Sequence, residues 1–338
     1  MTNDLMSIFT GKKVLITGGT GSLGQALTKR ILNSDVEQIR ILSRNEFKQI
    51  SMETKLPDER LRFLIGDVRD KDRLIRALDD VDIVFHAAAL KHVPKVEYNP
   101  FEAIKTNVQG SQNVIDACLE NDVQKAICIG TDKAVSPLNT YGATKLLMEK
   151  LFITAKRYSN PKKHPTKFLA VRYGNVFGSS GSVIPKFIGQ INNNEKITIT
   201  DPTMTRFSIT MNQALDFILK ATQKGHGAEV FIPKLKAYSL QQIHNILSNL
   251  TNAKDHEIIG MRTGEKQHEL LINSDEMRYA WSYDNMFVLL NELHESENLE
   301  EVYPGIKKIE DLDVYSSAKT QQLSTEEITE NIKDLQLL

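Results

Sequence analysis

Short apolar runs alternate with helical segments along the first half of the chain, and this alternation restricts the fold more than any other feature. The apolar runs lie at 12–18, 38–43, 61–67, 82–88, 125–130 and 166–172, with helical stretches such as 101–120 and 141–158 between them. Strands that are apolar throughout need a covering layer on both faces, which is typical of a parallel sheet flanked by helices. The sequence therefore predicts an α/β fold with a doubly wound parallel sheet.

The pattern loosens after residue 174. Residues 175–206 are loop-rich with one short helix at most, whereas 211–223 indicates a helix and 228–233 a further strand of the sheet. Beyond about residue 235, short helices and strands mix, and Ser324 followed by Glu327 predicts a capped terminal helix. We expect residues 1–174 with about 207–234 to form the sheet domain. Residues 175–206 with about 235–338 would form a smaller lobe over the carboxyl edge of the sheet.

Composition excludes several classes of function. The 42 basic and 43 acidic residues give a net charge of −1, so bulk charge offers no argument for nucleic acid or membrane binding. No apolar run approaches a membrane span and the first residues lack the apolar core of a signal peptide, so we expect a cytoplasmic protein. Cys118 and Cys128 lie in apolar stretches and are predicted to be buried free thiols. No His, Cys and carboxylate cluster has metal-ligand spacing, so no metal is predicted.

A glycine triplet follows the first strand. Gly18 permits a tight turn, Gly21 lets the backbone approach a pyrophosphate, and Gly24 allows close helix packing. The next helix points the positive end of its dipole at this site. A lone triplet is weak evidence, but here it opens a helix in a βαβ unit, the context that dinucleotide binding requires. The predicted phosphate loop comprises Gly18, Thr20, Gly21, Ser22, Leu23 and Gly24.

The residues after the second strand indicate which dinucleotide is bound. Ser43 and Arg44 stand where an NAD-binding protein normally offers a carboxylate to the ribose. A guanidinium pairs with a 2′-phosphate, and Lys48 can assist it, so the sequence favours NADP. The alternative is an exposed arginine without a ligand. Further predicted cofactor contacts are Asp67 and Val68 at the adenine, with Ala87, Ala88 and Lys91 after the fourth strand.

The segment 131–145 concentrates groups that transfer protons. Thr131, Asp132 and Lys133 are consecutive, and Tyr141 and Lys145 are four residues apart, which places them on one face of a helix. An ammonium beside the phenol would lower its pKa and make it a usable base. The alternative explanation is that these side chains are ordinary polar residues on the protein surface.

Several motifs occur in one order along the chain, and they resemble the inverting (5-epimerising) UDP-N-acetylglucosamine 4,6-dehydratases. These enzymes belong to the extended short-chain dehydrogenases/reductases and open the pathway to pseudaminic acid. The resemblance covers roughly residues 10–275, and YSS (315–317) shows a weaker resemblance to the same family. The motifs are LKHVP (90–94), TDKA (131–134), YGATK (141–145), RYGNV (172–176), GSVIP (181–185), TDPTMTRF (200–207) and RTGEKQHE (262–269).

The resemblance implies a role for each group in segment 131–145. Tyr141, aided by Thr131 and Lys145, takes the C4 hydroxyl proton while NADP⁺ accepts hydride. Lys133, if neutral, removes the C5 proton, and Asp132, if protonated, donates to the departing C6 hydroxyl. The pKa of Lys133 must then fall below its ordinary value near 10.4. The product would be UDP-2-acetamido-2,6-dideoxy-β-L-arabino-hex-4-ulose, with NADP bound tightly and recycled.

The resemblance also implies a pocket for UDP-N-acetylglucosamine and a homo-oligomer, either a dimer or a hexamer. A UDP-sugar 4-epimerase or 4-reductase would use the same Tyr141 and Lys145, but an epimerase needs no acid–base pair like Asp132 and Lys133. A non-catalytic NADP-binding regulatory protein is the remote alternative. The predicted substrate contacts are Lys91, Asn175, Ser182, Val183, Pro185, Thr200, Met204, Arg206, Arg262 and Glu265.

Overall fold

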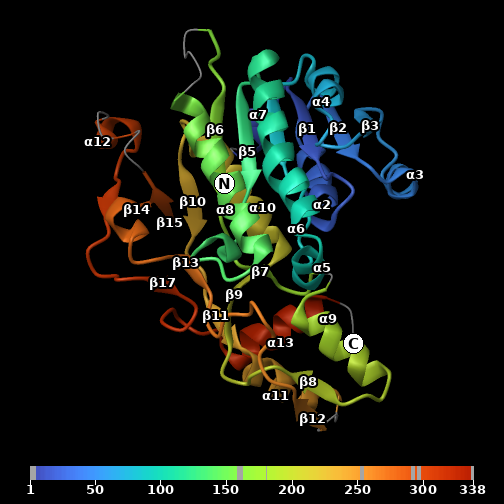
Figure 1. Ribbon diagram of the computed structural model, residues 1–338, viewed down its shortest axis with the longest axis vertical. Helices are drawn as coiled ribbons and strands as arrows, with labels where there is room; N and C mark the ends of the chain where they lie inside the picture. The colour runs from blue at the N-terminus through green and yellow to red at the C-terminus, as the bar shows by residue number, and fades with distance from the viewer. Residues whose placement is uncertain are drawn as a thin grey trace.

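The computed structural model describes residues 5–157, 163–179, 181–251, 255–290, 294 and 298–335. Ten strands of these residues form one sheet, which occupies the upper part of the molecule in Figure 1. In spatial order they are β16 (Lys307–Lys308), β14 (Ala280–Tyr283), β15 (Met286–Leu289), β10 (Val230–Pro233), β6 (Lys167–Val171), β5 (Lys125–Ile129), β4 (Ile83–His86), β1 (Lys13–Thr17), β2 (Gln38–Ser43) and β3 (Leu61–Ile65).

The strands from β3 to β10 are parallel, and their order is that of a doubly wound sheet. Val14 of β1 pairs with Ile39 of β2 on one side and with Ile83 of β4 on the other. The chain thus reverses its direction of winding beside β1, and in such sheets ligands bind outside the carboxyl ends of the strands at this point. The predicted fold class and the further strand at 228–233 are confirmed.

Helices cover both faces of the sheet, as the fully apolar strands require. One layer packs on Leu15 and Ala126, and the other packs on Val14 and Ile127. The first layer comprises α4 (Lys71–Leu78), α7 (Gly110–Glu120) and α8 (Thr140–Thr154), and the second α2 (Ser22–Ile31), α3 (Glu46–Lys55) and α10 (Met211–Lys224). Figure 1 shows α7 and α8 in front of the strands.

The predicted helical stretch at 101–120 is present, but it is not a regular α-helix throughout. It consists of α6 (Pro100–Ala103), a π-helical turn at Ile104–Gln109, and α7, and it is preceded by α5 (Val93–Tyr98). The wide turn accommodates Asn107, whose side chain accepts from Leu90 N at 2.7 Å and donates to Leu90 O at 3.0 Å and Thr144 Oγ1 at 3.0 Å. Asn107 thereby holds the start of the segment that carries Lys91.

A smaller lobe lies below the main sheet in Figure 1 and has its own apolar core, which includes Phe187, Tyr238 and Ile332. The capped helix predicted near the chain end is present, because Ser324 and Glu327 form a capping box. The elements of the lobe are β7 (Asn175–Val176), α9 (Val183–Asn192), β8 (Ile197–Ile199), β9 (Thr205–Ile209), β11 (Ala237–Ser239), α11 (Leu240–Thr251), β12 (His256–Ile258) and α13 (Thr325–Asp334).

The C-terminal third, which the sequence assigned to the lobe from about residue 235, is divided between the two parts. β14, β15 and β16 extend the main sheet, because β15 pairs antiparallel with β10. The apolar side chains of β15 are buried there, which explains why this hairpin joins the sheet. The helix α12 (Leu299–Val302) lies between β15 and β16 in the chain. The strand β13 (Leu270–Ile272) pairs with β17 (Tyr315–Ser316) at the junction with the lobe.

Candidate active site

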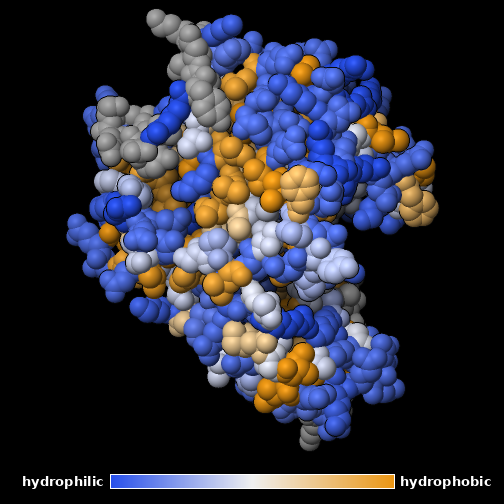
Figure 2. Space-filling model, in the orientation of Figure 1, coloured by the Kyte–Doolittle hydropathy of each residue, from blue (hydrophilic) through white to orange (hydrophobic). Residues whose placement is uncertain are grey.

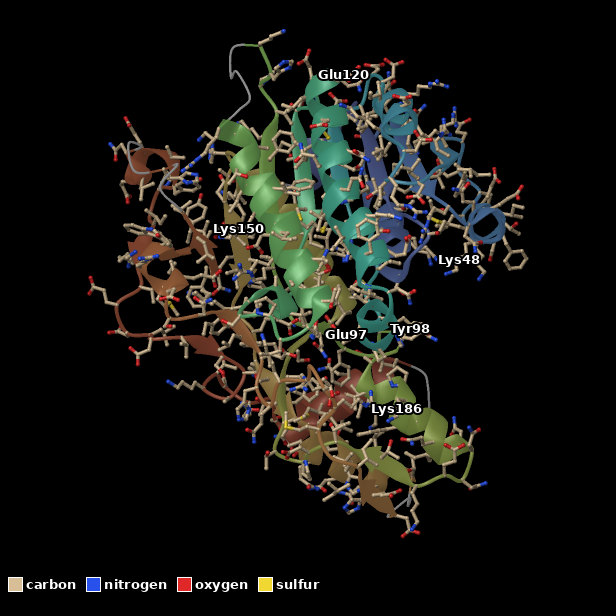
Figure 3. All side chains as sticks on the ribbon, viewed as in Figure 1. Lys48, Glu97, Tyr98, Glu120, Lys150 and Lys186 are labelled. Atoms are coloured by element: carbon tan, nitrogen blue, oxygen red, sulfur yellow. The ribbon has the colours of Figure 1, made fainter. Side chains whose placement is uncertain are left out.

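A cavity of about 1060 Å³ lies at the carboxyl ends of the parallel strands and extends to the lobe. On the right of Figure 2, the surface is indented between the part that carries α3 and the lobe. Lys48 of α3 and Lys186 of α9, both labelled in Figure 3, line the cavity from these two sides. The cavity therefore joins the glycine loop at one end to the lobe at the other.

The glycine loop has the geometry that the sequence predicts. Gly18 has a φ of +65°, and a Cβ there would lie 2.9 Å from Ala88 Cα. A Cβ on Gly24 would lie 2.4 Å from the Gly19 carbonyl oxygen, so only glycine lets α2 pack so close to the loop. Gly21 precedes α2 without a capping side chain, which leaves amide groups of the first turn facing the cavity. These features fit the pyrophosphate of a dinucleotide.

The predicted ribose and adenine contacts lie at this end, but only some of them reach the cavity. Lys48 lines it, whereas Arg44 is exposed and pairs with Asp67, Nη1 to Oδ2, at 3.7 Å. Among the predicted contacts within the described ranges, Ser43, Arg44, Asp67 and Val68 do not line the cavity.

The strand β5 leads into the turn Thr131–Lys133, which lines the cavity. The Thr131 hydroxyl donates to Asp132 Oδ1 at 2.8 Å, and Asp132 is completely buried. Lys133 Nζ donates to the same Asp132 oxygen at 2.9 Å and to Asn175 Oδ1 at 3.1 Å. An ammonium and a carboxylate are thus in direct contact, which permits a proton to pass between them.

Lys133 has a second carboxylate beside it. Glu269 Oε1 lies 3.4 Å from Lys133 Nζ, and the Lys133 side chain is 26% exposed. Burial lowers the pKa of Lys133, but Asp132 and Glu269 raise it more, so the net direction is well above its ordinary value. The predicted fall of this pKa concerns the complex with substrate and stays a prediction; without substrate, Asp132 and then Glu269 hold the pKa in the opposite direction.

Helix α8 carries the Tyr141–Lys145 pair. The Asn139 side chain caps this helix by accepting from Gly142 N at 2.8 Å. Burial raises the pKa of Tyr141 to about 12. The positive charge of Lys133 and the hydrogen bond with Thr131 act in the opposite direction and lower it.

Lys145, predicted to lower the pKa of Tyr141, is held by other groups in the structure. Its Nζ donates to the Ile129 carbonyl oxygen at 2.5 Å and to Met148 Sδ at 3.2 Å, and burial lowers its pKa. The expected lowering of the Tyr141 pKa therefore comes from Lys133, which lies in the preceding turn, and it is outweighed by burial.

Most of the predicted substrate contacts line the lobe side of the cavity. Arg262 and Lys91 are exposed, while Arg206 is buried and donates to the carbonyl oxygens of Thr205 at 2.8 Å and Gln267 at 3.1 Å. Pro185 and Met204 do not line the cavity, and Met204 instead packs beneath Arg206. The predicted residues that line this side are Lys91, Asn175, Ser182, Val183, Thr200, Arg206, Arg262 and Glu265.

The loop that carries Arg262 and Glu265 is attached to the segment between the Thr131–Lys133 turn and α8. Asn139 Nδ2 donates to the Gly264 carbonyl oxygen at 2.9 Å, and Lys266 Nζ donates to the Val135 carbonyl oxygen. The same asparagine therefore caps the helix of Tyr141 and holds the loop.

Sequence reasoning missed Glu269, Lys186, Lys266 and Tyr173, all of which line the cavity. Glu269 and Lys266 belong to the RTGEKQHE segment, and Tyr173 to RYGNV, so their motifs were visible although their positions were not. Lys186 follows GSVIP in the first turn of α9, and the helical spacing from Ser182 was the available signal.

Other sequence expectations concern thiols, metals and membranes. Cys118 and Cys128 are buried free thiols, as predicted. Within the described ranges, no group of three or more His, Cys, Asp and Glu side chains is placed to hold a metal ion. No helix in the same ranges has the length and apolar character needed to cross a membrane.

Comparisons with known proteins place the chain among nucleotide-sugar enzymes. Residues 14–291 match the polysaccharide biosynthesis protein family. An inverting UDP-N-acetylglucosamine 4,6-dehydratase of Campylobacter jejuni is 48% identical over 285 residues, 83% of this chain and 84% of that protein. A UDP-glucose 4-epimerase of Rickettsia bellii is 42% identical over 333 residues, 97% of each chain. The crystal structure of Pen from Bacillus thuringiensis superposes with a TM-score of 0.89 at 38% identity, covering 98% of this chain and 99% of that one.

Proposed function

Since the chain belongs to the polysaccharide biosynthesis protein family of extended short-chain dehydrogenases/reductases, we propose that it dehydrates UDP-N-acetylglucosamine at C5 and C6 and inverts C5. The observation that carries this proposal is the contact of Asp132 with Lys133, in the same cavity as Tyr141. Oxidation at C4 alone needs only a base such as Tyr141. An adjacent acid and base are what elimination across C5 and C6 adds to that requirement.

A nicotinamide cofactor fits the glycine loop, and NADP is the form that we propose. Gly18, Gly21 and the first turn of α2 would hold its pyrophosphate, while Lys48 would reach a 2′-phosphate, with Arg44 turning from Asp67 towards it. When bound, the cofactor accepts hydride from C4 and returns it to C6, so the overall reaction is redox-neutral.

Tyr141 would take the proton of the C4 hydroxyl. Its phenol interacts with Thr131, which also supports Asp132 through a hydrogen bond of 2.8 Å. Because the positive charge of Lys133 lowers the pKa of Tyr141, the two steps of the reaction are electrostatically linked. If Lys133 were neutral, the pKa of Tyr141 would be higher. The phenol would then ionise less readily, although its phenolate would bind a proton more strongly.

The 4-ketone makes the C5 hydrogen acidic, and the Asp132–Lys133 pair would then act. Transfer of one proton across their 2.9 Å hydrogen bond converts the ion pair into a neutral amine and a neutral acid. Lys133 then takes the C5 proton, Asp132 gives its proton to the C6 hydroxyl, and water leaves. Reduction at C6 would be completed by a proton delivered to the opposite face of C5, which inverts that centre. Substrate that covers the turn would favour the neutral form of the pair, because burial lowers the pKa of Lys133.

The lobe side of the cavity would bind the UDP portion. Arg262 and Lys186 are exposed cations on neighbouring elements of the lobe. Each would attract the negatively charged oxygens of a diphosphate. Lys91 and Asn175 would contact the sugar and its first phosphate. The product would serve the synthesis of pseudaminic acid or a related surface glycan, and we propose a homo-oligomer as the active form.

A UDP-sugar 4-epimerase is the second candidate, because the Rickettsia relatives match nearly the whole chain. Epimerisation requires Tyr141 and Lys145 but gives Asp132 and Lys133 no task at C5 and C6. The buried acid–base contact therefore favours dehydration.

One experiment separates the two candidates. The purified protein is incubated with UDP-N-acetylglucosamine without added NADP, and the product is identified by proton NMR. We expect a 4-keto-6-deoxy sugar inverted at C5, with solvent deuterium at C5 when the reaction runs in heavy water. Formation of the C4 epimer, with C6 still hydroxylated, would contradict the proposal.

A further inference from the structure

Glu269 is a buried acid at the site to which the proposed reaction assigns no task. It is 4% exposed, lines the cavity, and directly precedes β13. Its amide nitrogen donates to Ser317 Oγ at 2.9 Å, and its carbonyl oxygen accepts from Ser317 N at 2.9 Å. Ser317 also contacts Thr205 Oγ1 at 2.7 Å. Three segments that are distant in the sequence thus meet to fix the backbone of Glu269.

The carboxylate of Glu269 faces two cations. Oε1 lies 3.4 Å from Lys133 Nζ and 3.8 Å from Arg206 Nε. Oε2 is buried and has no hydrogen-bond partner in the described part of the chain. A buried carboxylate with an unsatisfied oxygen is costly, so stability does not explain why the acid stands there. The position of the Glu269 carboxylate against Lys133 explains why the acid stands there.

We propose that Glu269 is a positioning residue whose carboxylate holds the Lys133 ammonium beside Asp132 and governs how readily Lys133 releases its proton for the reaction. This inference rests on the proposed function, in which Lys133 works at C5. Without the negative charge of Glu269, the neutral amine of Lys133 is favoured. With that charge present, Lys133 returns to the ammonium form after it has passed on a proton.

Other charged and titratable groups also face Lys133, and all of them remain when Glu269 alone is changed. Asp132 precedes it in the turn, Arg206 comes from β9, and Lys266 from the loop before Glu269. Tyr141 of α8 and Tyr238 of β11 are the neighbouring phenols. Since Arg206 and Lys266 oppose a positive Lys133, Glu269 and Asp132 are the two groups that sustain its charge.

The first test needs no turnover. Lysine methylene groups are labelled with carbon-13 and the Lys133 signal, assigned with Lys133→Arg, is titrated by NMR in Asp132→Asn and in Asp132→Asn/Glu269→Gln. Without Asp132, Glu269 is the remaining carboxylate in contact with Lys133 among the described residues. We expect the titration midpoint to be lower by about one pH unit or more in the double variant. Equal midpoints would overturn the inference.

The second test concerns catalysis. A base works only when unprotonated, so Glu269→Gln should move the rising acid-side limb of the kcat profile for dehydration to lower pH, by about one pH unit. Glu269→Asp, which keeps the charge, should restore the wild-type limb, and Glu257→Gln on the exposed strand β12 is a control for loss of a lobe carboxylate. An unshifted limb in Glu269→Gln would refute the role. If wild type gives no dehydrated product, the proposed function fails, while the NMR comparison still decides the effect of Glu269 on Lys133.

Discussion

Replacement of Arg172 by methionine should destabilise the protein strongly, because this guanidinium is fully buried between two acids. It donates to Glu149 Oε2 at 3.0 Å, to Glu276 Oε1 and Oε2 at 2.9 Å, and to the Leu271 carbonyl oxygen at 2.8 Å. Glu149 lies on α8, whereas Glu276 and Leu271 belong to the segment that follows Glu269. The cluster therefore joins the helix of Tyr141 to the chain that carries Glu269.

The magnitude follows from the charges that the variant leaves behind. Breaking a buried pair typically costs about 3–5 kcal/mol of unfolding free energy, because the remaining charge is uncompensated. At about 2.1 cal/mol/K per residue, a chain of 338 residues has an unfolding entropy of roughly 0.7 kcal/mol/K. The expected fall in Tm is thus about 4–7 °C near pH 7.5, measured by calorimetry or circular dichroism.

The pH dependence gives a second, independent check. Burial raises the pKa of Glu276, but Arg172 lowers it more, so its folded pKa lies below its unfolded value. Its stabilising contribution is present above the unfolded pKa and is lost as the pH falls through the folded pKa. In Arg172→Met, Glu276 loses its cation, so it becomes neutral at higher pH, and the difference in Tm between the variant and wild type should narrow towards about pH 5.

A control variant separates charge from packing. Arg172→Met combined with Glu149→Met and Glu276→Met removes the unpaired charges and should recover most of the lost Tm. If the triple variant were as unstable as Arg172→Met, or if that single variant lost less than about 1 kcal/mol, the electrostatic reasoning would be refuted.

Four further outcomes test the site. Tyr141→Phe should nearly abolish turnover while nucleotide-sugar affinity, measured by calorimetry, stays close to wild type; retained turnover would exclude this phenol as the base. Lys133→Ala should accumulate reduced cofactor absorbance without dehydration, and more slowly than wild type reduces its cofactor, because Lys133 lowers the pKa of Tyr141. The dinucleotide released from the denatured protein should be NADP, and recovery of NAD alone would contradict the assignment of Arg44 and Lys48. Asn139→Asp keeps the cap of α8 but loses the donor to the Gly264 carbonyl, so it should raise KM for the nucleotide sugar without lowering Tm, whereas Asn139→Ala should lower Tm as well.

The fold was predictable because its signals are local. Each parallel strand is a short apolar run between helices, and the glycine triplet marks one tight turn whose φ and close contacts agree with the prediction. The hairpin β14–β15 was assigned to the lobe because its neighbour in the sheet, β10, is remote in sequence. A pattern along the chain carries no information about which distant strand it will pair with.

The acid and base residues of the site were predictable because they are close in sequence. Thr131, Asp132, Lys133 and Tyr141 lie in one segment, and the structure gathers them in one cavity. The contact of Glu269 with Lys133 was missed, because Glu269 reaches Lys133 from the far end of another motif. Likewise, the sequence spacing of Tyr141 and Lys145 does not reveal that Lys145 bonds to the end of β5.

The same geometry indicates where the choice of reaction resides in this chain. Tyr141 and Lys145 stand on α8 of the main sheet domain, and in the proposed reaction they serve oxidation at C4, a step that a 4-epimerase would share. Glu269 lies 3.4 Å from Lys133, and Arg206 of β9 in the lobe lies 3.8 Å from Glu269. Because a lysine acts as a base only after it loses its proton, the groups that set its charge decide whether elimination follows oxidation. The contact of Glu269 with Lys133, and that of Arg206 with Glu269, are therefore where a dehydratase and an epimerase built on this sheet should differ.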